Sequence, residues 1–275
     1  MYGDFRDITT GKVNDPTGRR FDLVTVKNTP DAKRDYEGVT ANVTYRLRSM
    51  QAGGNYTLAW SRGNVDGENA GSGPIRATIN DFPEYREPRW NNPYGYTLND
   101  QRHKARMWLS YRAPEAHDLG EVTLGVVQRL DSALPYDANQ IIDTRPYVTN
   151  PGYITPPASA TYSFSDRYGL RFDNVWTTDL SLYWAKKPPK MTKTEMFFRG
   201  VLTNVFNNSG QVGGDSTVFT AASPGTSTGL QPFNPFTTRP VEGVNYVKSE
   251  GFGKPSGTTD YQTPRTFNFS IGIRF

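Results

Sequence analysis

Strict alternation between apolar and polar residues marks the last ten residues of the chain, TFNFSIGIRF. Successive side chains of a β-strand point to opposite faces, so a period of two predicts a strand with one apolar and one polar face. Large apolar groups that fill a final strand and end in an aromatic residue are typical of a strand whose outer face meets lipid. The apolar row consists of Phe267, Phe269, Ile271, Ile273 and Phe275.

The same alternation recurs along the chain and predicts about eight strands in an antiparallel sheet. It is clearest in residues 36–48, where the sequence reads YEGVTANVTYRLR. Residues 1–12 carry no such pattern, and we expect them to form a loop. The other predicted strands are residues 21–28, 55–62, 102–112, 121–131, 175–185, 195–207 and 266–275.

Charged residues within these strands fall on the face opposite the apolar row. In residues 195–207 we assign the faces by Arg199, which leaves Phe198, Leu202 and Phe206 pointing outward. A charge turned to the bilayer midplane costs about 2–4 kcal/mol, so this sorting favours a barrel with a wet lumen. A soluble sheet with one solvated face would show the same alternation. The residues predicted to face the lumen are Arg46, Arg106, Arg129, Asp179 and Arg199.

The lengths of the connections separate these two explanations. Short connections at residues 49–54, 113–120 and 186–194 alternate with long ones that lack predicted strands. In an up-and-down barrel such alternation places every long loop on the same rim, as outer-membrane barrels do. Compact soluble domains rarely contain several structureless connections longer than about 12–15 residues. The long connections are residues 63–101, 132–174 and 208–262.

Composition excludes several other classes of protein. Only 35% of the 275 residues are hydrophobic, and no stretch approaches the roughly 20 apolar residues of a membrane-spanning helix. The absence of cysteine excludes disulfides and thiolate metal sites. The net charge of +4 forms no basic run, which argues against nucleic-acid binding. Neither of the two histidines, His103 and His117, lies in a catalytic motif, so we expect no enzyme activity, cofactor or metal.

Aromatic residues are concentrated in the long connections. Aromatic side chains in surface loops either bind a ligand or pack the loops against each other, and we expect packing for most of them. The candidates for a ligand-facing role are Tyr85, Trp90, Tyr94, Tyr96, Tyr136, Tyr147, Tyr153, Phe233 and Phe236.

Several segments together resemble the C-terminal part of a TonB-dependent receptor barrel. These are TFNFSIGIRF at residues 266–275, LTNVFNN at 202–208, TTDLSLYW at 177–184 and DQRHKARMWLSY at 100–111. YEGVTANVTYRL at 36–47 and GGNYTLAWSRGNVDGE at 53–68 are similar to the Oar-like branch of that family. The resemblance implies a larger barrel of twenty-two strands in the outer membrane of a Gram-negative cell, with extracellular loops that capture a nutrient ligand for transport. It also implies that the C-terminal apolar row is the signal recognised by the barrel-assembly machinery.

On this basis we expect residues 1–275 to be an all-β, antiparallel up-and-down segment of a transmembrane β-barrel. We see no plug domain, TonB box or signal peptide in the sequence, and therefore interpret it as a C-terminal fragment, or a truncated gene product, of a longer receptor. TonB would act only through the missing N-terminal part, and the ligand would be a small molecule, a glycan or a peptide. One alternative is a self-contained eight-stranded anchor or adhesin barrel, which requires residues 21–28 to pair with the C-terminal strand. Another is a soluble carbohydrate-binding β-sandwich.

Overall fold

The computed structural model describes residues 4–14, 16, 20–28, 33–64, 94–114, 120–150, 152–154, 159–189, 194–222 and 229–275. Every element with described bounds is a β-strand or a three-residue 3-10 helix, which confirms the all-β prediction. No helix among these residues is long and apolar enough to cross a membrane. The long strands are β3 (Arg34–Leu47), β4 (Met50–Gly63), β6 (His103–Arg112), β7 (Glu121–Asp131), β12 (Val175–Lys186), β13 (Glu195–Thr203) and β16 (Thr266–Arg274).

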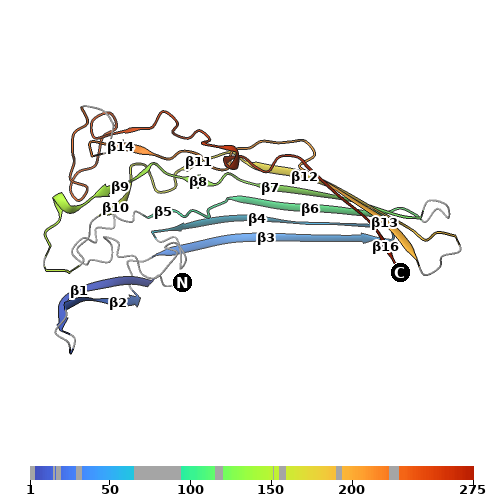
Figure 1. Cartoon of the computed structure of the whole chain (residues 1–275), viewed down its shortest axis with the longest axis horizontal. Coiled ribbons are helices and arrows are strands. Elements are labelled where there is room, and N and C mark those ends of the chain that lie inside the picture. The colour runs from blue at the N-terminus through green and yellow to red at the C-terminus, as the bar shows by residue number, and fades with distance from the viewer. Residues whose placement is uncertain are drawn as a thin grey trace.

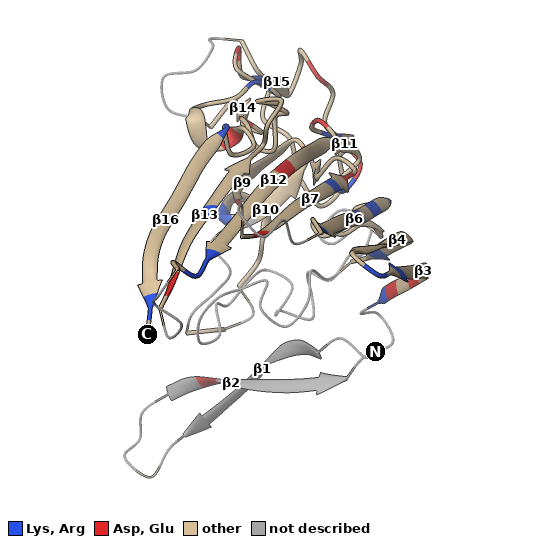
Figure 2. Ribbon diagram, turned by 90° about the vertical axis from the view of Figure 1, so that its right-hand side faces the viewer, with Lys and Arg blue, Asp and Glu red and all other residues tan. Residues whose placement is uncertain are grey.

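These seven strands form one antiparallel sheet in the order β16-β13-β12-β7-β6-β4-β3, so each long strand lies beside its neighbour in the sequence. Figure 1 shows the strands running side by side along the length of the molecule, and Figure 2 shows that they follow an arc. Among the described strands β16 pairs only with β13, and β3 only with β4. The sheet is therefore open at both edges, and residues 21–28 do not pair with the C-terminal strand.

Short strands lie at the end of the sheet where the long connections are (left in Figure 1), and apart from β5 they form separate two-stranded sheets. The expectation that these connections lack strands is wrong, because backbone groups in a packed loop still need hydrogen-bond partners. β5 (Gly95–Tyr96) pairs with β4. The other pairs are β8 (Pro135–Tyr136) with β11 (Leu170–Arg171), β9 (Asn139–Asp143) with β10 (Ser159–Ser163), and β14 (Val218–Thr220) with β15 (Tyr246–Lys248).

Most predicted strand positions are confirmed, with three corrections. β1 (Asp4–Asn14) pairs with β2 (Arg20–Asn28), so the start of the chain is a hairpin and not the expected loop. β4 begins at Met50, which leaves only a tight turn where a connection at 49–54 was predicted. β13 ends at Thr203 and not at residue 207, because a turn follows.

The register of the ladder gives the tilt of the strands relative to the line that joins their ends at the side of the short connections. A strand without tilt would be perpendicular to this line. The row of paired residues that starts at Leu47, the last residue of β3, reaches Phe269 of β16, five residues before the end of that strand at Arg274. This shift accumulates over six strand steps. With about 3.4 Å per residue and about 4.8 Å between strands, it corresponds to a tilt of about 30°. Outer-membrane barrels have tilts of about 35–45°, close to this value.

Buried apolar residues gather in the loop region and not on a face of the main sheet. One cluster contains Ala138, Val218 and Tyr246, and the other contains Ile142, Tyr162 and Phe233. Phe164 packs against both clusters and forms edge or tilted ring contacts with the three aromatic members. The long loops thus form a packed unit at one end of the sheet.

Candidate functional site: the sheet faces and the loop rim

One face of the main sheet is largely apolar, and it carries exposed apolar side chains on every long strand. Directly paired residues share a face, so the register shows that the face with Val39 and Val43 on β3 is the face with Phe269 and Ile271 on β16. Val39 is 71% exposed and Ile271 is 72% exposed. The five residues of the proposed assembly signal, Phe267, Phe269, Ile271, Ile273 and Phe275, are all exposed here.

A single polar pair interrupts the middle of this face. Gln128 on β7 lies opposite Thr178 on β12, in the position where the row on each strand is otherwise apolar. Thr178 Oγ1 donates a hydrogen bond to Gln128 Oε1 at 2.5 Å. Because the two side chains satisfy each other, the pair costs less on an apolar face than either residue would alone.

The other face carries the charges, and all five predicted lumen residues lie on it. Arg106 lies directly opposite Arg129, and both bind Asp131, which is only 2% exposed. The distances from Asp131 are 2.8 Å to Arg106 Nη2 and 2.7 Å to Arg129 Nε. Register places Arg46, Asp179 and Arg199 on the same face.

The segment TNVFNN forms a turn that ties three strands together at the loop end of the sheet. Asn204 is completely buried and has a positive φ of 51°. Its backbone N–H donates to Asp179 Oδ1 of β12 at 2.8 Å, and its Nδ2 donates to the carbonyl of Thr263, just before β16. Asn207, also at a positive φ of 53°, accepts the N–H of Arg265. This turn is the physical reason why β13 stops at Thr203.

The structure divides the loop aromatic residues into packed and open positions. Tyr85 and Trp90 lie outside the described residues. Tyr136 stacks on Phe172 with ring centroids 4.2 Å apart, and Tyr153 and Phe233 are buried. Tyr147 is half-buried in a 3-10 helix (Arg145–Tyr147). Tyr94, Tyr96 and Phe236 instead line a cleft of about 950 Å³.

This cleft lies between segments of all three long connections. Its walls come from residues 94–96, 162–167, 169 and 236–240. Besides the aromatic rings they include the hydroxyl groups of Ser163 and Thr237 and the charged side chains of Asp166 and Arg239. A cleft of this size with aromatic walls and a few polar groups has the usual dimensions of a small-molecule site.

Guanidinium groups surround Tyr96, one of the residues that line the cleft. Arg171, Arg62 and Arg102 lie 4.9, 5.5 and 5.8 Å from its ring centroid. Hydrogen bonding from Arg102, and then from Arg62, lowers the pKa of Tyr96 below its ordinary value. Asp100, whose side chain is fully buried, holds Arg171 through a contact of 2.5 Å.

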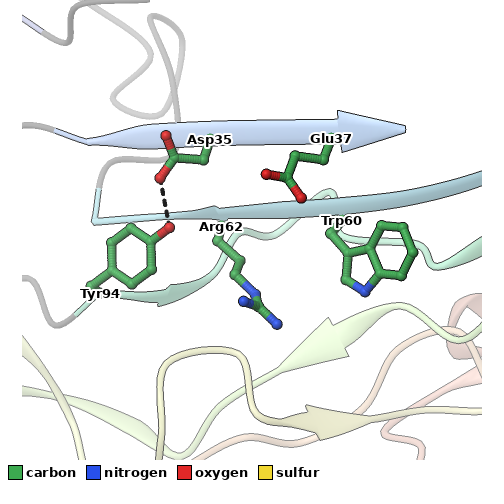
Figure 3. Close-up of a pocket in the computed structure, with 5 residues that line it drawn as sticks. All are labelled: Asp35, Glu37, Trp60, Arg62 and Tyr94. Carbon is green, nitrogen blue, oxygen red and sulfur yellow. Dashed lines mark hydrogen bonds between the residues drawn. The ribbon is translucent and has the colours of Figure 1, made fainter. Parts of the chain in front are cut away.

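A second, smaller pocket of about 240 Å³ lies near the start of β3 and the end of β4 (Figure 3). Asp35 lies opposite Arg62, and Glu37 lies opposite Trp60. Tyr94 donates its hydroxyl hydrogen to Asp35 Oδ2 at 2.6 Å, and this hydrogen bond raises the pKa of Tyr94. In Figure 3 the guanidinium of Arg62 points away from both carboxylates. No three histidine or carboxylate side chains of the described part of the chain gather into a metal site.

The sequence offered no local signal for the guanidinium cluster, since Arg62, Arg102 and Arg171 are separated by long stretches of chain. The pocket at Asp35 and Glu37 did leave a signal in the sequence: on the outward row of β3, the two residues that precede Val39 are charged and not apolar.

Comparisons with protein-family models, with curated proteins and with solved structures find no match for this chain. A functional conclusion for this chain therefore has to be based on its residues and their geometry.

Proposed function

We propose that the chain is the barrel wall and extracellular loop region of an outer-membrane transporter of the TonB-dependent receptor class, which takes up a nutrient ligand. The main support is the apolar, exposed face that crosses seven strands while the charged residues gather on the opposite face. An outward face of this kind suits lipid, and the charged face suits an aqueous lumen.

The height of the apolar face agrees with a membrane. From Val39 to Leu47 the outward row of β3 rises about 27 Å along the strand, or about 23 Å at a tilt of about 30°. Outer-membrane barrels have an apolar band about 25 Å tall with aromatic residues at both borders. On β12 the apolar part of the outward row begins at Trp176 and ends at Trp184, before Lys186 at the end of the strand, which fits such borders.

The open edges of β3 and β16 favour a part of a larger barrel over a small closed one. In lipid the unpaired backbone groups of an edge strand have no water to bind, so both edges need partner strands. Further strands of the same barrel would supply them. The loop rim, with its cleft of about 950 Å³, would then be the ligand-facing end.

Adjacent residues on β3 provide a direct test of the outward face. Val43 lies midway along the apolar row and Thr44 lies on the polar face, and both are exposed. Val43→Arg is expected to destabilise the membrane-inserted protein by about 2–4 kcal/mol, because the charge would face the bilayer midplane. Thr44→Arg, the matched control, is expected to change stability by less than about 0.5 kcal/mol.

The measurement is urea titration of the protein in outer-membrane vesicles, together with its distribution between membrane and soluble fractions. Equal losses in the two variants would contradict the proposed orientation. Recovery of the wild-type chain in the soluble fraction without detergent would support the soluble sandwich instead.

A further inference from the structure

The large cleft in the loop region contains a buried hydroxyl group. Tyr162 on β10 lines this cleft and is only 8% exposed. Its ring packs edge-on against Phe164 and Phe233, with centroid distances of 5.0 and 5.7 Å, so the side chain is held in place. Within the described part of the chain, its hydroxyl makes no hydrogen bond. Because buried polar groups are normally paired, this hydroxyl is available to a ligand in the cleft.

A guanidinium group lies on the same cleft wall. Arg239 is exposed there, and the described residues give its side chain no ion pair or hydrogen bond. Burial raises the pKa of Tyr162, and the nearby charge of Arg239 opposes this shift. The backbone N–H groups of Thr237 and Thr238 both donate to the carbonyl of Asn234, which fixes the turn before Arg239. A guanidinium and a hydroxyl that face one cleft are donors for a carboxylate.

The other charged groups of the wall limit the charge of the ligand. Arg167 is buried and lies over the ring of Tyr168, 5.4 Å from its centroid. Asp166 is exposed on the same wall and would repel a second negative charge. A carboxylate therefore suits this wall better than a phosphate dianion. The carboxylate of Asp166 can also accept hydrogen bonds from hydroxyl groups of a ligand.

Tyr94 provides a flat surface for a ring. It lines the cleft, is 52% exposed, and no ring or cation of the described residues stacks on it. Its hydroxyl donates to Asp35 at 2.6 Å, which holds the side chain in one orientation (Figure 3). The apolar face of a sugar ring packs well on such a side chain. The cleft volume of about 950 Å³ has room for several linked rings.

The polar face of the main sheet has an excess of the same positive charge. Among the described strand residues of this face, basic side chains outnumber acidic ones, and carboxylates such as Asp131 are already paired. In the described structure some of the basic side chains of this face have neither an ion pair nor a side-chain hydrogen bond. These are Arg34, Arg46, Lys104 and Arg199. Their potential favours an anionic ligand over a neutral one.

We propose that the cleft binds an acidic sugar chain, with the carboxylate of one sugar on Arg239 and the hydroxyl of Tyr162. A sugar ring packs on Tyr94, and sugar hydroxyls donate to Asp166. This inference rests on the proposed function, because it assigns the chemistry of the nutrient ligand at the loop rim.

The test is isothermal titration calorimetry on the whole 275-residue chain in mild detergent at low salt. The probes are trigalacturonate, the neutral sugar maltotriose, and benzoate, a ring acid without hydroxyls. Trigalacturonate is expected to bind at least tenfold more tightly than either of the others. Arg239→Gln and Tyr162→Phe are each expected to weaken its binding by about tenfold, the effect of one charge-assisted hydrogen bond.

The variants are chosen so that folding does not explain the result. Arg239 is exposed, and Tyr162→Phe keeps the ring that packs in the loop core. Lys187→Gln, the matched control, removes an exposed positive charge from the short connection after β12 and is expected to leave binding unchanged.

Equal affinity for trigalacturonate and maltotriose, or full affinity in Arg239→Gln, would overturn the carboxylate site. Benzoate binding as tight as that of trigalacturonate would overturn the assignment to a sugar. Absence of binding by all three probes would overturn the site and leave intact the barrel orientation, which the Val43→Arg variant tests. Trigalacturonate binding by a chain that is soluble without detergent would overturn the proposed function alone.

Discussion

Asn204 is the residue whose replacement tests the packing of the loop end most directly. Its side chain makes three hydrogen bonds: Nδ2 donates to the carbonyls of Asn208 and Thr263, both at 2.9 Å, and Oδ1 accepts the N–H of Asn208 at 3.0 Å. The residue is completely buried, so water cannot replace these bonds. Asn204→Ala removes all three hydrogen bonds of this side chain.

The cost of this replacement has two parts. Each hydrogen bond contributes about 1 kcal/mol net to stability, which gives about 3 kcal/mol for the three. The backbone of Asn204 has a φ of 51°, a conformation that asparagine tolerates but that costs alanine about 1 kcal/mol more. Asn204→Ala is thus expected to reduce the free energy of unfolding by about 4 kcal/mol, and Asn204→Gly by about 3 kcal/mol because glycine avoids the backbone term.

Urea unfolding of the chain, followed by tryptophan fluorescence, measures both values. Asn42→Ala serves as the control, because Asn42 is an exposed asparagine within β3, and its loss is expected to change stability by less than about 0.5 kcal/mol. A loss below about 1 kcal/mol for Asn204→Ala would refute the reasoning, since it would mean that the buried hydrogen bonds contribute nothing net. A larger loss for the glycine variant than for the alanine variant would refute the backbone argument.

Two other predictions concern charged groups. Asp131→Asn should reduce the free energy of unfolding by about 2 kcal/mol, because the facing Arg106 and Arg129 lose their shared counter-charge while keeping partial exposure to solvent; little or no loss in a urea titration would count against this ion cluster. Tyr96 should ionise below the ordinary tyrosine value, and Arg102→Gln should move its pKa upward, as measured by phenolate absorbance relative to a Tyr96→Phe variant. Since the folded pKa is lowered, the stability that Tyr96 ionisation contributes is complete above the unfolded value and is lost as pH falls through the folded value. An unchanged titration in the Arg102 variant would contradict the assigned cause.

Alternation predicted the long strands well because each has one row of apolar residues that must share a face. The start of β4 at Met50 was not predicted, because Gly53 and Gly54 interrupt the apolar row and glycines in a sequence favour a loop. The structure gives Gly53 another role: a Cβ atom there would lie 2.7 Å from the ring of Trp108, so only glycine leaves room for the indole. The glycine therefore reflects packing on the polar face and not a turn.

The predicted end of β13 was too late, because the apolar pattern in the sequence continues beyond the strand. Val205 and Phe206 continue the apolar content after Leu202, so the pattern predicted more strand. The two asparagines at positive φ end the strand instead, and their hydrogen bonds reach Thr263 and Arg265, about sixty residues later in the chain. A contact over that separation leaves no periodic signal, and the same limit applies to the guanidinium groups around Tyr96.

The exposed apolar face itself argues for lipid over a second protein layer. Monomeric soluble proteins rarely expose a contiguous apolar patch larger than a few hundred Å². Here large apolar side chains are exposed on every long strand, and in the described part of the chain the buried clusters lie in the loops and not on this face. A covering protein layer would require only apolar contact, and it would not explain the tryptophans at both ends of the apolar row on β12 or the carboxylates between Val39 and the start of β3. A bilayer explains all three features, because its apolar core, its borders and its headgroups each favour the residues found at that height.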